Sequence, residues 1–75
     1  MKNKLRKWRR FRDFTQSQLA EKAGVSRQTI YSIEQGRYVP STLLSLKLAG
    51  LLELQVEELF ELEEGDWDHS KGAPN

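Results

Sequence analysis

The chain has 75 residues and contains no cysteine. This length provides one domain with one modest core, and the lack of thiols excludes both disulfide bonds and a thiolate zinc site. Apolar runs stay well short of the roughly 18 residues that a membrane span requires, and the basic N-terminus lacks the apolar segment of a signal peptide. We therefore expect a cytoplasmic protein without a membrane partner, in which an oligomer supplies extra burial.

The net charge of +1 hides a strong asymmetry along the chain. Residues 1–37 carry ten Lys or Arg and three acids, for a charge of +7, whereas residues 38–75 carry two Lys and eight acids, for a charge of −6. Segregated charge creates one surface that attracts polyanions and another that repels them. A solvated basic helix face would explain the first half equally well, so charge alone does not decide between the two interpretations.

The spacing of apolar residues predicts helices throughout, because Val, Ile and Thr are too scattered for a sheet. The first predicted helix covers residues 3–13 and places Leu5, Trp8 and Arg12 on related faces. Phe11 lies outside that stripe, and we expect it to be partly exposed. Trp8, with Phe14 after the helix, is expected to belong to the core and not to a base-stacking platform.

The second predicted helix runs from residue 16 to Ala23. It follows a capping box, Thr15-Gln16-Ser17-Gln18, in which the side chains of residues 15 and 18 satisfy each other's backbone amides. Gly24 ends the helix, since glycine accepts the left-handed conformation of a tight helix exit. The buried residues of this helix are expected to be Leu19, Ala20 and Ala23.

Serines precede the next two predicted helices, and serine is a good N-cap. Ser26 begins a third helix over 27–35, which buries Ile30 and Ile33 and is closed by Gly36. Pro40-Ser41 opens a fourth helix over 42–51. The residues of the fourth helix that we expect to face inward are Leu43, Leu46, Leu48 and Leu51 or Leu52.

The end of the chain carries weaker signals. A short fifth helix is predicted over 56–60, with Val56, Leu59 and Phe60 as its apolar face. Residues 60–63 then alternate with a period of two, which is a weak strand signal. Residues 65–75 are rich in Gly, Asp, Ser, Pro and Asn, and predict a flexible acidic and polar tail after a domain of residues 1–64.

The most informative segment is residues 16–35, QSQLAEKAGVSRQTIYSIEQ. Two short helices can lock at a steep angle only if a small residue lies at their crossing, here Ala20, and a glycine takes the turn, here Gly24. Apolar side chains must also join the pair to the rest of the domain. All of these conditions are met together by Leu19, Ala23, Val25, Ile30 and Ile33, which makes this a strong helix-turn-helix signal.

On these residues the chain resembles the Cro/C1-type (XRE-like) helix-turn-helix regulators of bacteria, archaea and phages. The resemblance covers roughly residues 4–60 and includes LRKWRRFRDFTQSQLAEKAG, VSRQTIYSIEQGRYVPS and LQVEELF. It implies an all-α, five-helix, lambda-repressor-like domain that acts as a homodimer on a palindromic operator in double-stranded DNA, with helix 27–35 in the major groove. The 16–35 segment and the basic N-terminal half together favour a repressor. We expect the dimer surface on the fourth and fifth helices, with the 60–67 segment and residues 1–5 joined in a short strand pair.

Chemistry and the family resemblance together assign DNA contacts to eight residues. Arg pairs bidentately with guanine and Gln with adenine, so Arg27 and Gln28 suit base readout at the start of the third helix. The remaining base-contact candidates are Tyr31 and Ser32. Gln16 matches the family's phosphate-binding glutamine at a helix N-terminus, where free amides face a phosphate. The other phosphate-contact candidates are Thr29, Arg37 and Tyr38.

Arg9 and Glu34 match a pair that, in the family pattern, bridges the first helix to the end of the third. We interpret them as a structural, buried or half-buried ion pair. Reading of cytosine by Glu34 is the alternative, but Glu34 lies too late on its helix for that role. Two other positions depart from the pattern. Asp13 occupies a place where glycine is frequent, and Asp tolerates left-handed geometry. Glu53 occupies a place where Gly or Asn is frequent.

Other features do not indicate further sites. His69 has no second ligand at metal spacing, and the C-terminal acids lack calcium-loop spacing and a neighbouring nucleophile. We therefore expect no enzyme, no cofactor, no metal and no small-molecule ligand. Trp67 is expected in a dimer interface, since an exposed tryptophan on an acidic tail is otherwise unfavourable.

Several alternatives share this domain. An antitoxin, a restriction-modification controller or a phage switch protein would use the same DNA-binding surface. A protein-interaction module would keep the fold without specific DNA readout and bind a basic partner through its acidic half. Arg27, Gln28 and Ser32 count against this last alternative, because a former DNA reader should have lost its groove-compatible residues.

Overall fold

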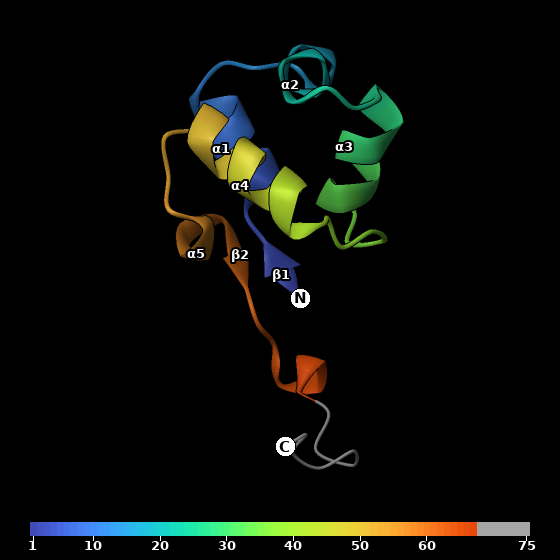
Figure 1. Cartoon of the computed structure of the whole chain (residues 1–75), viewed down its shortest axis with the longest axis vertical. Helices are drawn as coiled ribbons and strands as arrows, with labels where there is room; N and C mark the ends of the chain where they lie inside the picture. The colour runs from blue at the N-terminus through green and yellow to red at the C-terminus, as the bar shows by residue number, and fades with distance from the viewer. Residues whose placement is uncertain (68–75) are drawn as a thin grey trace.

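Five α-helices and two short strands make up residues 1–67, the part of the chain that the structure, a computed structural model, describes. The helices are α1 (Leu5–Phe11), α2 (Gln16–Ala23), α3 (Arg27–Glu34), α4 (Thr42–Leu51) and α5 (Val56–Leu59). The strands are β1 (Lys2–Asn3) and β2 (Phe60–Glu61), and a 3₁₀ turn, η1, follows at Glu64–Asp66. The predicted fold, five helices with a short terminal strand pair, is confirmed (Figure 1).

Local capping sets both ends of α2 and the start of α3 as predicted, and α3 ends at Glu34, one residue before the predicted end. Thr15 Oγ1 accepts from the backbone N–H of Gln18 at 3.0 Å, and the Thr15 N–H donates to the Gln18 side chain at 2.8 Å. The turn that follows α2 is made by Gly24, which has a φ of 77°. Ser26 then caps α3 by accepting from the N–H of Thr29 at 3.1 Å. These contacts place α2 and α3 as the two crossed helices of the motif, visible side by side in Figure 1.

Two non-glycine residues have left-handed backbone geometry, and both lie where the family pattern departs from its usual residue. Asp13 follows α1 with a φ of 61°, and Glu53 follows α4 with a φ of 60°. Arg12 joins the two helix ends, since its Nε donates to the carbonyl of Leu52 at 3.0 Å. The fold thus accepts both departures from glycine.

The core lies between the helices and is entirely aliphatic. Trp8 and Phe14 are partly buried and pack against it, as expected for core residues, whereas Phe11 is 66% exposed. The buried apolar residues are Leu5, Leu19, Ala20, Ala23, Ile30, Ile33, Leu44, Leu48, Ala49, Leu52 and Leu59.

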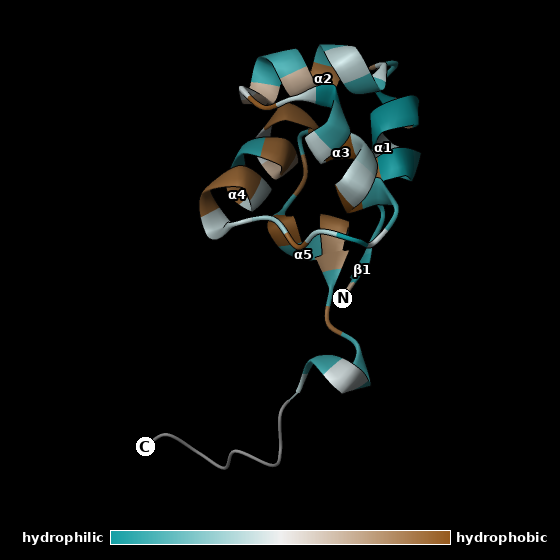
Figure 2. Cartoon of the chain, turned by 90° about the vertical axis from the view of Figure 1, so that its right-hand side faces the viewer, coloured by the Kyte–Doolittle hydropathy of each residue, from teal (hydrophilic) through white to brown (hydrophobic). Residues whose placement is uncertain are grey.

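The predicted inner face of α4 was wrong at two positions. Leu43 and Leu46 are 69% and 56% exposed, whereas Leu44 and Ala49 are buried in their place. Figure 2 shows the reason: α4 is apolar along most of its length, in contrast to the hydrophilic α1. Spacing cannot identify the buried side of such a helix, and packing against α2 decides it.

The chain ends meet in the strand pair. Lys2 lies opposite Glu61 and Asn3 opposite Phe60 in antiparallel register. Because residues 2–3 and 60–61 are extended, α1 begins at residue 5 and α5 ends at residue 59, later and earlier than predicted. The Asn3 side-chain amide donates to the carbonyl of Ile33 at 2.9 Å and so joins β1 to α3.

Candidate nucleic-acid interface

Helix α3 presents its polar side outward. Arg27 and Gln28 are exposed, and Tyr31 and Ser32 are partly exposed, while Ile30 and Ile33 on the other side are fully buried. The Gln28 amide nitrogen donates to the Ser32 hydroxyl one turn further on, at 3.4 Å. The four residues predicted to contact bases are therefore accessible on the one helix that the motif assigns to readout.

A shallow hollow adjoins this side of α3. It is lined by two of the base-contact candidates and three of the phosphate-contact candidates, namely Gln28, Thr29, Ser32, Arg37 and Tyr38. The Thr29 hydroxyl is hydrogen-bonded to the Ser26 hydroxyl at 3.0 Å, next to the N-terminus of α3. Arg37 and Tyr38 are exposed in the loop that follows the helix. The fold thus gathers five of the eight predicted contact residues in one place.

Gln16 lies apart from this hollow. It lines an open groove between α1, α2 and α3, together with Arg27 and Tyr31. Candidate phosphate contacts consequently flank α3 on two sides, with Gln16 on one and Arg37 and Tyr38 on the other.

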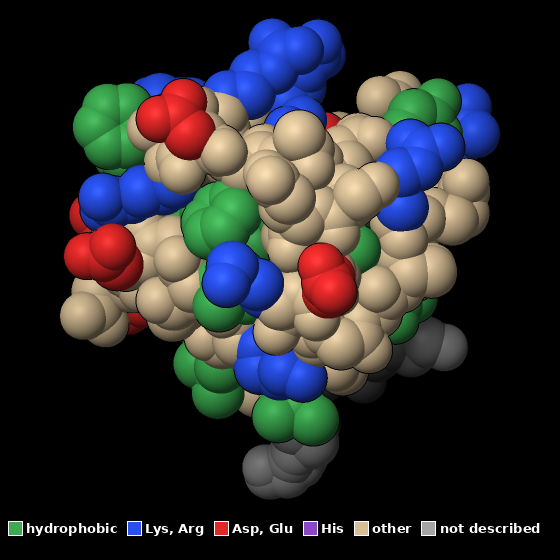
Figure 3. All heavy atoms as spheres, turned by 90° about the horizontal axis from the view of Figure 1, so that it is seen from above, with side chains coloured by type: hydrophobic (Ala, Val, Ile, Leu, Met, Phe, Trp, Pro, Cys, Tyr) green, Lys and Arg blue, Asp and Glu red, His purple; other side chains and the backbone are tan. Residues whose placement is uncertain are grey.

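The same groove contains basic residues that the sequence-based assignment missed. Arg6 and Arg10 are exposed on α1 and line the groove with Gln16 and Arg27. The charge asymmetry was the available signal, but a position on the first helix gave no reason to place these side chains beside α3. Figure 3, a view of one face, shows Lys and Arg side chains spread over the surface, with a few acidic and apolar side chains among them.

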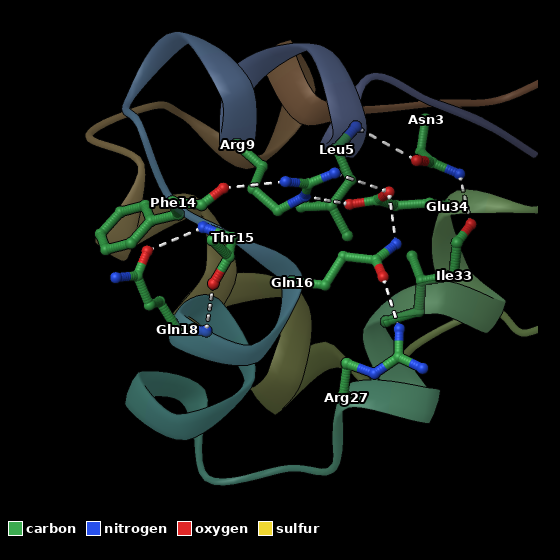
Figure 4. Close-up of polar contacts among 10 residues, drawn as sticks. All are labelled: Asn3, Leu5, Arg9, Phe14, Thr15, Gln16, Gln18, Arg27, Ile33 and Glu34. Carbon is green, nitrogen blue, oxygen red and sulfur yellow. Dashed lines mark hydrogen bonds and ion pairs between the residues drawn. The ribbon is translucent and has the colours of Figure 1, made fainter.

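A chain of polar contacts crosses the floor of the groove (Figure 4). Arg9 Nε donates to Glu34 Oε2 at 2.6 Å, and Arg9 Nη2 donates to Glu34 Oε1 at 3.3 Å. The Gln16 Nε2 donates to Glu34 Oε1 at 3.2 Å, and the Gln16 Oε1 accepts from Arg27 Nη1 at 3.0 Å. The Arg9 and Glu34 side chains are only 9% and 2% exposed, so this ion pair is buried.

Comparisons with known proteins agree with this geometry. A family described as "Helix-turn-helix" matches residues 5–59, which is most of the chain. The chain belongs to this helix-turn-helix family. The family consists of DNA-binding transcription regulators and not of enzymes, and it confirms the resemblance inferred from residues 16–35.

Individual members of the helix-turn-helix family match closely. The uncharacterized HTH-type transcriptional regulator MJ0272 of Methanocaldococcus jannaschii is 46% identical over 66 residues, covering 88% of this chain and all of that protein. The restriction-modification controller protein C.AhdI of Aeromonas hydrophila is 33% identical, with a TM-score of 0.71 over 76% of this chain and 86% of its own. The N-terminal DNA-binding domain of SinR from Bacillus subtilis is 29% identical, with a TM-score of 0.71 over 81% of this chain and 90% of its own.

Neither metal ligands nor a membrane span accompany the helix-turn-helix in the described part of the chain. Within residues 1–67, the Asp and Glu side chains form no group of three that could hold a metal ion. The helices of the same residues are too short to cross a membrane. His69 lies outside the described residues.

Proposed function

We propose that this helix-turn-helix protein binds a palindromic operator in double-stranded DNA as a homodimer, with α3 in the major groove, and represses transcription in the cytoplasm. The proposal depends on one observation, the arrangement of the candidate DNA-contacting side chains on and around α3. Groove-compatible side chains are exposed along it, and phosphate-binding candidates flank it on both sides. A helix that enters the major groove needs this combination, because phosphate contacts set the register and base contacts select the sequence.

The base contacts follow from side-chain chemistry. Arg27 would pair with O6 and N7 of a guanine, and Gln28 with N6 and N7 of an adenine. Tyr31 would touch a thymine methyl or a sugar, and Ser32 would bond to either base type. All four belong to the first six residues of α3, the end that enters the groove in this motif.

The candidate phosphate contacts lie on both sides of α3. Gln16 at the start of α2 would bind a phosphate on one side, where Arg6 and Arg10 add positive charge. Thr29, Arg37 and Tyr38 would bind phosphates on the other side. Neutralising phosphates releases counterions, so affinity should fall steeply with salt.

A homodimer is supported by apolar surface that the domain leaves uncovered. Val39, Leu43 and Leu46 are 63%, 69% and 56% exposed. Beside them, Pro40, Val56 and Phe60 line a mostly apolar hollow with Leu46. Exposed apolar side chains that gather on one surface often mark a protein–protein interface. A second copy would cover it symmetrically and hold two α3 helices for half-sites about 34 Å apart. Trp67, which is 58% exposed, would add to the interface.

Repression requires no additional contact in this arrangement. A dimer bound across a promoter excludes other proteins from the same DNA by occupancy. Activation would require a surface that contacts the transcription machinery as well.

One alternative role has a specific observation in its favour. The similarity to C.AhdI, at 33% identity, favours a restriction-modification controller that uses the same DNA-binding surface. An antitoxin would use it in the same way. The neighbouring genes distinguish these roles: a methyltransferase and nuclease pair indicates a controller, and a toxin gene indicates an antitoxin.

Selection of bound duplexes from a random pool tests the proposal. We expect an enriched palindrome whose half-sites are separated by about one helical turn. A fluorescence titration then compares that duplex with its shuffled version at moderate salt, and light scattering gives the oligomeric state. Equal affinity for both duplexes would contradict sequence-specific binding, and a monomer with and without DNA would contradict the dimer.

A further inference from the structure

We infer that the α-amine of Met1 is a modification site, at which acetylation releases the segment 62–67 and weakens the homodimer. The inference starts from one ammonium that holds two carboxylates of this segment. Met1 N lies 2.9 Å from Glu63 Oε1 and 3.0 Å from Asp66 Oδ1. The effect on the dimer rests on the proposed function, in which Trp67 adds to the interface. Release of the segment does not depend on the proposed function.

The segment 62–67 projects away from the helices (Figures 1 and 2). All of its residues are exposed. Its backbone hydrogen bonds are internal, from the N–H of Asp66 to the carbonyl of Glu63 at 2.9 Å and from the N–H of Trp67 to the carbonyl of Glu64 at 3.2 Å. Within residues 1–67, the polar contacts of this segment with the rest of the chain are those of the Met1 ammonium. The ammonium therefore ties the segment to the domain.

Glu63 and Asp66 turn their carboxylates to the same nitrogen. The η1 turn brings the two residues together, since the N–H of Glu63 donates to Asp66 Oδ2 at 2.7 Å. Two neighbouring negative charges repel each other unless a cation lies between them. In the described part of the chain, no Lys or Arg side chain pairs with either carboxylate. The turn consequently depends on the charge of Met1.

The folded domain holds Met1 in place from two sides. Its backbone leads into β1, in which Lys2 lies opposite Glu61. Its side chain lines the apolar hollow with Leu46 and Phe60. Because the strand pair and the hollow fix the position of Met1, a chemical change at its nitrogen acts directly on the two carboxylates.

Acetylation removes the group that both carboxylates bind. In this reaction the unprotonated amine attacks the carbonyl carbon of an acyl thioester. An N–C bond forms, the C–S bond breaks, and the leaving thiolate takes up one proton from the nitrogen. The product is a neutral amide with one N–H donor in place of three, and its new carbonyl oxygen can only accept hydrogen bonds. The contact of Met1 with Asp66 is exposed, so the thioester reaches the nitrogen when the segment opens.

The consequence for the dimer follows from the place of Met1. The hollow that it lines includes Leu46, which belongs to the apolar surface proposed for a second copy. The ammonium thus holds the segment that carries Trp67 at the edge of that surface. An interface side chain on an ordered segment loses less conformational freedom on binding than one on a mobile segment. Acetylation should therefore weaken the dimer while the helices stay intact.

Chemical synthesis of the 75-residue chain with a free or an acetylated Met1 nitrogen tests the inference. Limited proteolysis of dilute, monomeric protein, with the cleavage sites identified by mass spectrometry, reports how often the segment 62–67 opens. The loss of two surface ion pairs should raise the rate of cleavage within the segment about three- to tenfold. Sedimentation equilibrium should show a dimer dissociation constant about two- to fivefold higher for the acetylated chain. Circular dichroism should show the same helical content in both chains.

Two controls separate charge from bulk. A single methyl group on the Met1 nitrogen keeps the positive charge and two N–H donors, so the methylated chain should be cleaved as slowly as the free amine. Glu63→Gln with Asp66→Asn removes both negative charges and keeps the size of the side chains. In this double variant, acetylation should cause no further increase in cleavage, because the partners of the ammonium are already gone.

Equal cleavage of the free and acetylated chains would overturn the inference. Methylation that accelerates cleavage as much as acetylation would also overturn it, because bulk would then be the cause. An unchanged dimer dissociation constant after release of the segment would overturn the proposed effect on the dimer. Monomers in both chains, with faster cleavage of the acetylated one, would contradict the proposed homodimer and support release of the segment.

Discussion

Arg9 Nε and Glu34 Oε2 lie 2.6 Å apart and join α1 to the last residue of α3, 25 positions further along the chain. The contact is nearly sealed from solvent, with 9% and 2% of the two side chains exposed. It fixes the end of the helix that carries the candidate base contacts against the first helix of the domain. This ion pair therefore contributes both to the stability of the domain and to the geometry of the candidate DNA-binding surface.

Arg9→Met should destabilise the domain strongly, because it leaves the buried carboxylate of Glu34 without its partner. Removal of one member of a buried pair costs about 3–5 kcal/mol. Urea denaturation followed by circular dichroism measures the free energy of unfolding. The double variant Arg9→Met with Glu34→Leu removes both charges and should regain much of the loss; equal instability of the double variant would contradict the electrostatic explanation.

Gly24→Ala and Gly50→Ala should have opposite effects on stability. At Gly24 the φ of 77° disfavours any residue with a Cβ, and the strain costs about 1–2 kcal/mol. A Cβ there would meet Lys47 Nζ at an ordinary 3.6 Å, so the penalty comes from the backbone. Gly50 lies inside α4, and a Cβ added there would meet open space, so alanine should stabilise that helix by about 1 kcal/mol. Paired thermal unfolding curves check both signs.

Leu43→Glu with Leu46→Glu should abolish dimerisation while preserving the fold. Both side chains are more than half exposed, so charge at these positions costs the monomer little and opposes a second copy. Light scattering should report a monomer with an unchanged helical spectrum. Leu48→Ala is the comparison for a buried position of the same helix. Leu48 is fully buried, and its truncation should cost about 2–5 kcal/mol of stability. A dimer that survives both glutamates would exclude this surface.

Arg27→Ala and Arg37→Ala should separate selectivity from affinity. The first removes a candidate bidentate contact with guanine and should cost about 1–3 kcal/mol of preference at one base pair. The second removes a candidate phosphate contact and should weaken all sequences alike, reducing the salt slope by about one. Titrations at several salt concentrations distinguish the two. Uniform weakening by Arg27→Ala would contradict its assignment to base readout.

The Met1 ammonium and the Asp66 carboxylate should titrate away from their usual ranges. The pKa of the Met1 ammonium is raised from 8.0 by hydrogen bonds to Glu63, at 2.9 Å, and Asp66, at 3.0 Å. The pKa of Asp66 is lowered from 3.8 by a hydrogen bond from the backbone of Glu63 and by the ammonium. Stability from the raised group is complete below pH 8.0 and is lost as pH rises through its folded pKa. Stability from the lowered group is present above pH 3.8 and is lost as pH falls through its folded pKa.

The contact of the Met1 ammonium with Glu63 and Asp66 should therefore persist from about pH 4 to pH 8 and be lost further out, as pH passes the two folded pKa values. NMR titration of the Asp66 carboxyl carbon measures the shift directly. Asp66→Asn is the control, and it should lower the pKa of the ammonium toward its ordinary value. An Asp66 that titrates at its ordinary pKa would contradict the contact.

Local chemistry in the sequence was sufficient for the elements whose limits depend on nearest neighbours. Thr15 and Gln18 bond to each other's backbone within four residues, and Gly24 makes its turn without help from distant parts of the chain. The same holds for the exposed side of α3, because Ile30 and Ile33 mark its buried side by spacing alone. The resemblance to helix-turn-helix regulators rests on these local features, which is why the sequence sufficed for it.

Tertiary packing decided what local rules leave open. Helix α4 carries apolar side chains on several of its sides, so its own sequence does not select the buried one. Packing against α2 determines that Leu44 is buried and Leu43 is exposed. The strand pair closed only because residues 2–3 and 60–61 meet in space, which shortened α1 and α5. The placement of Gln16 between Glu34 and Arg27 likewise joins two helices across 18 and 11 positions. Spacing along a chain specifies which side chains share a helix face, but contacts between faces depend on how the helices cross.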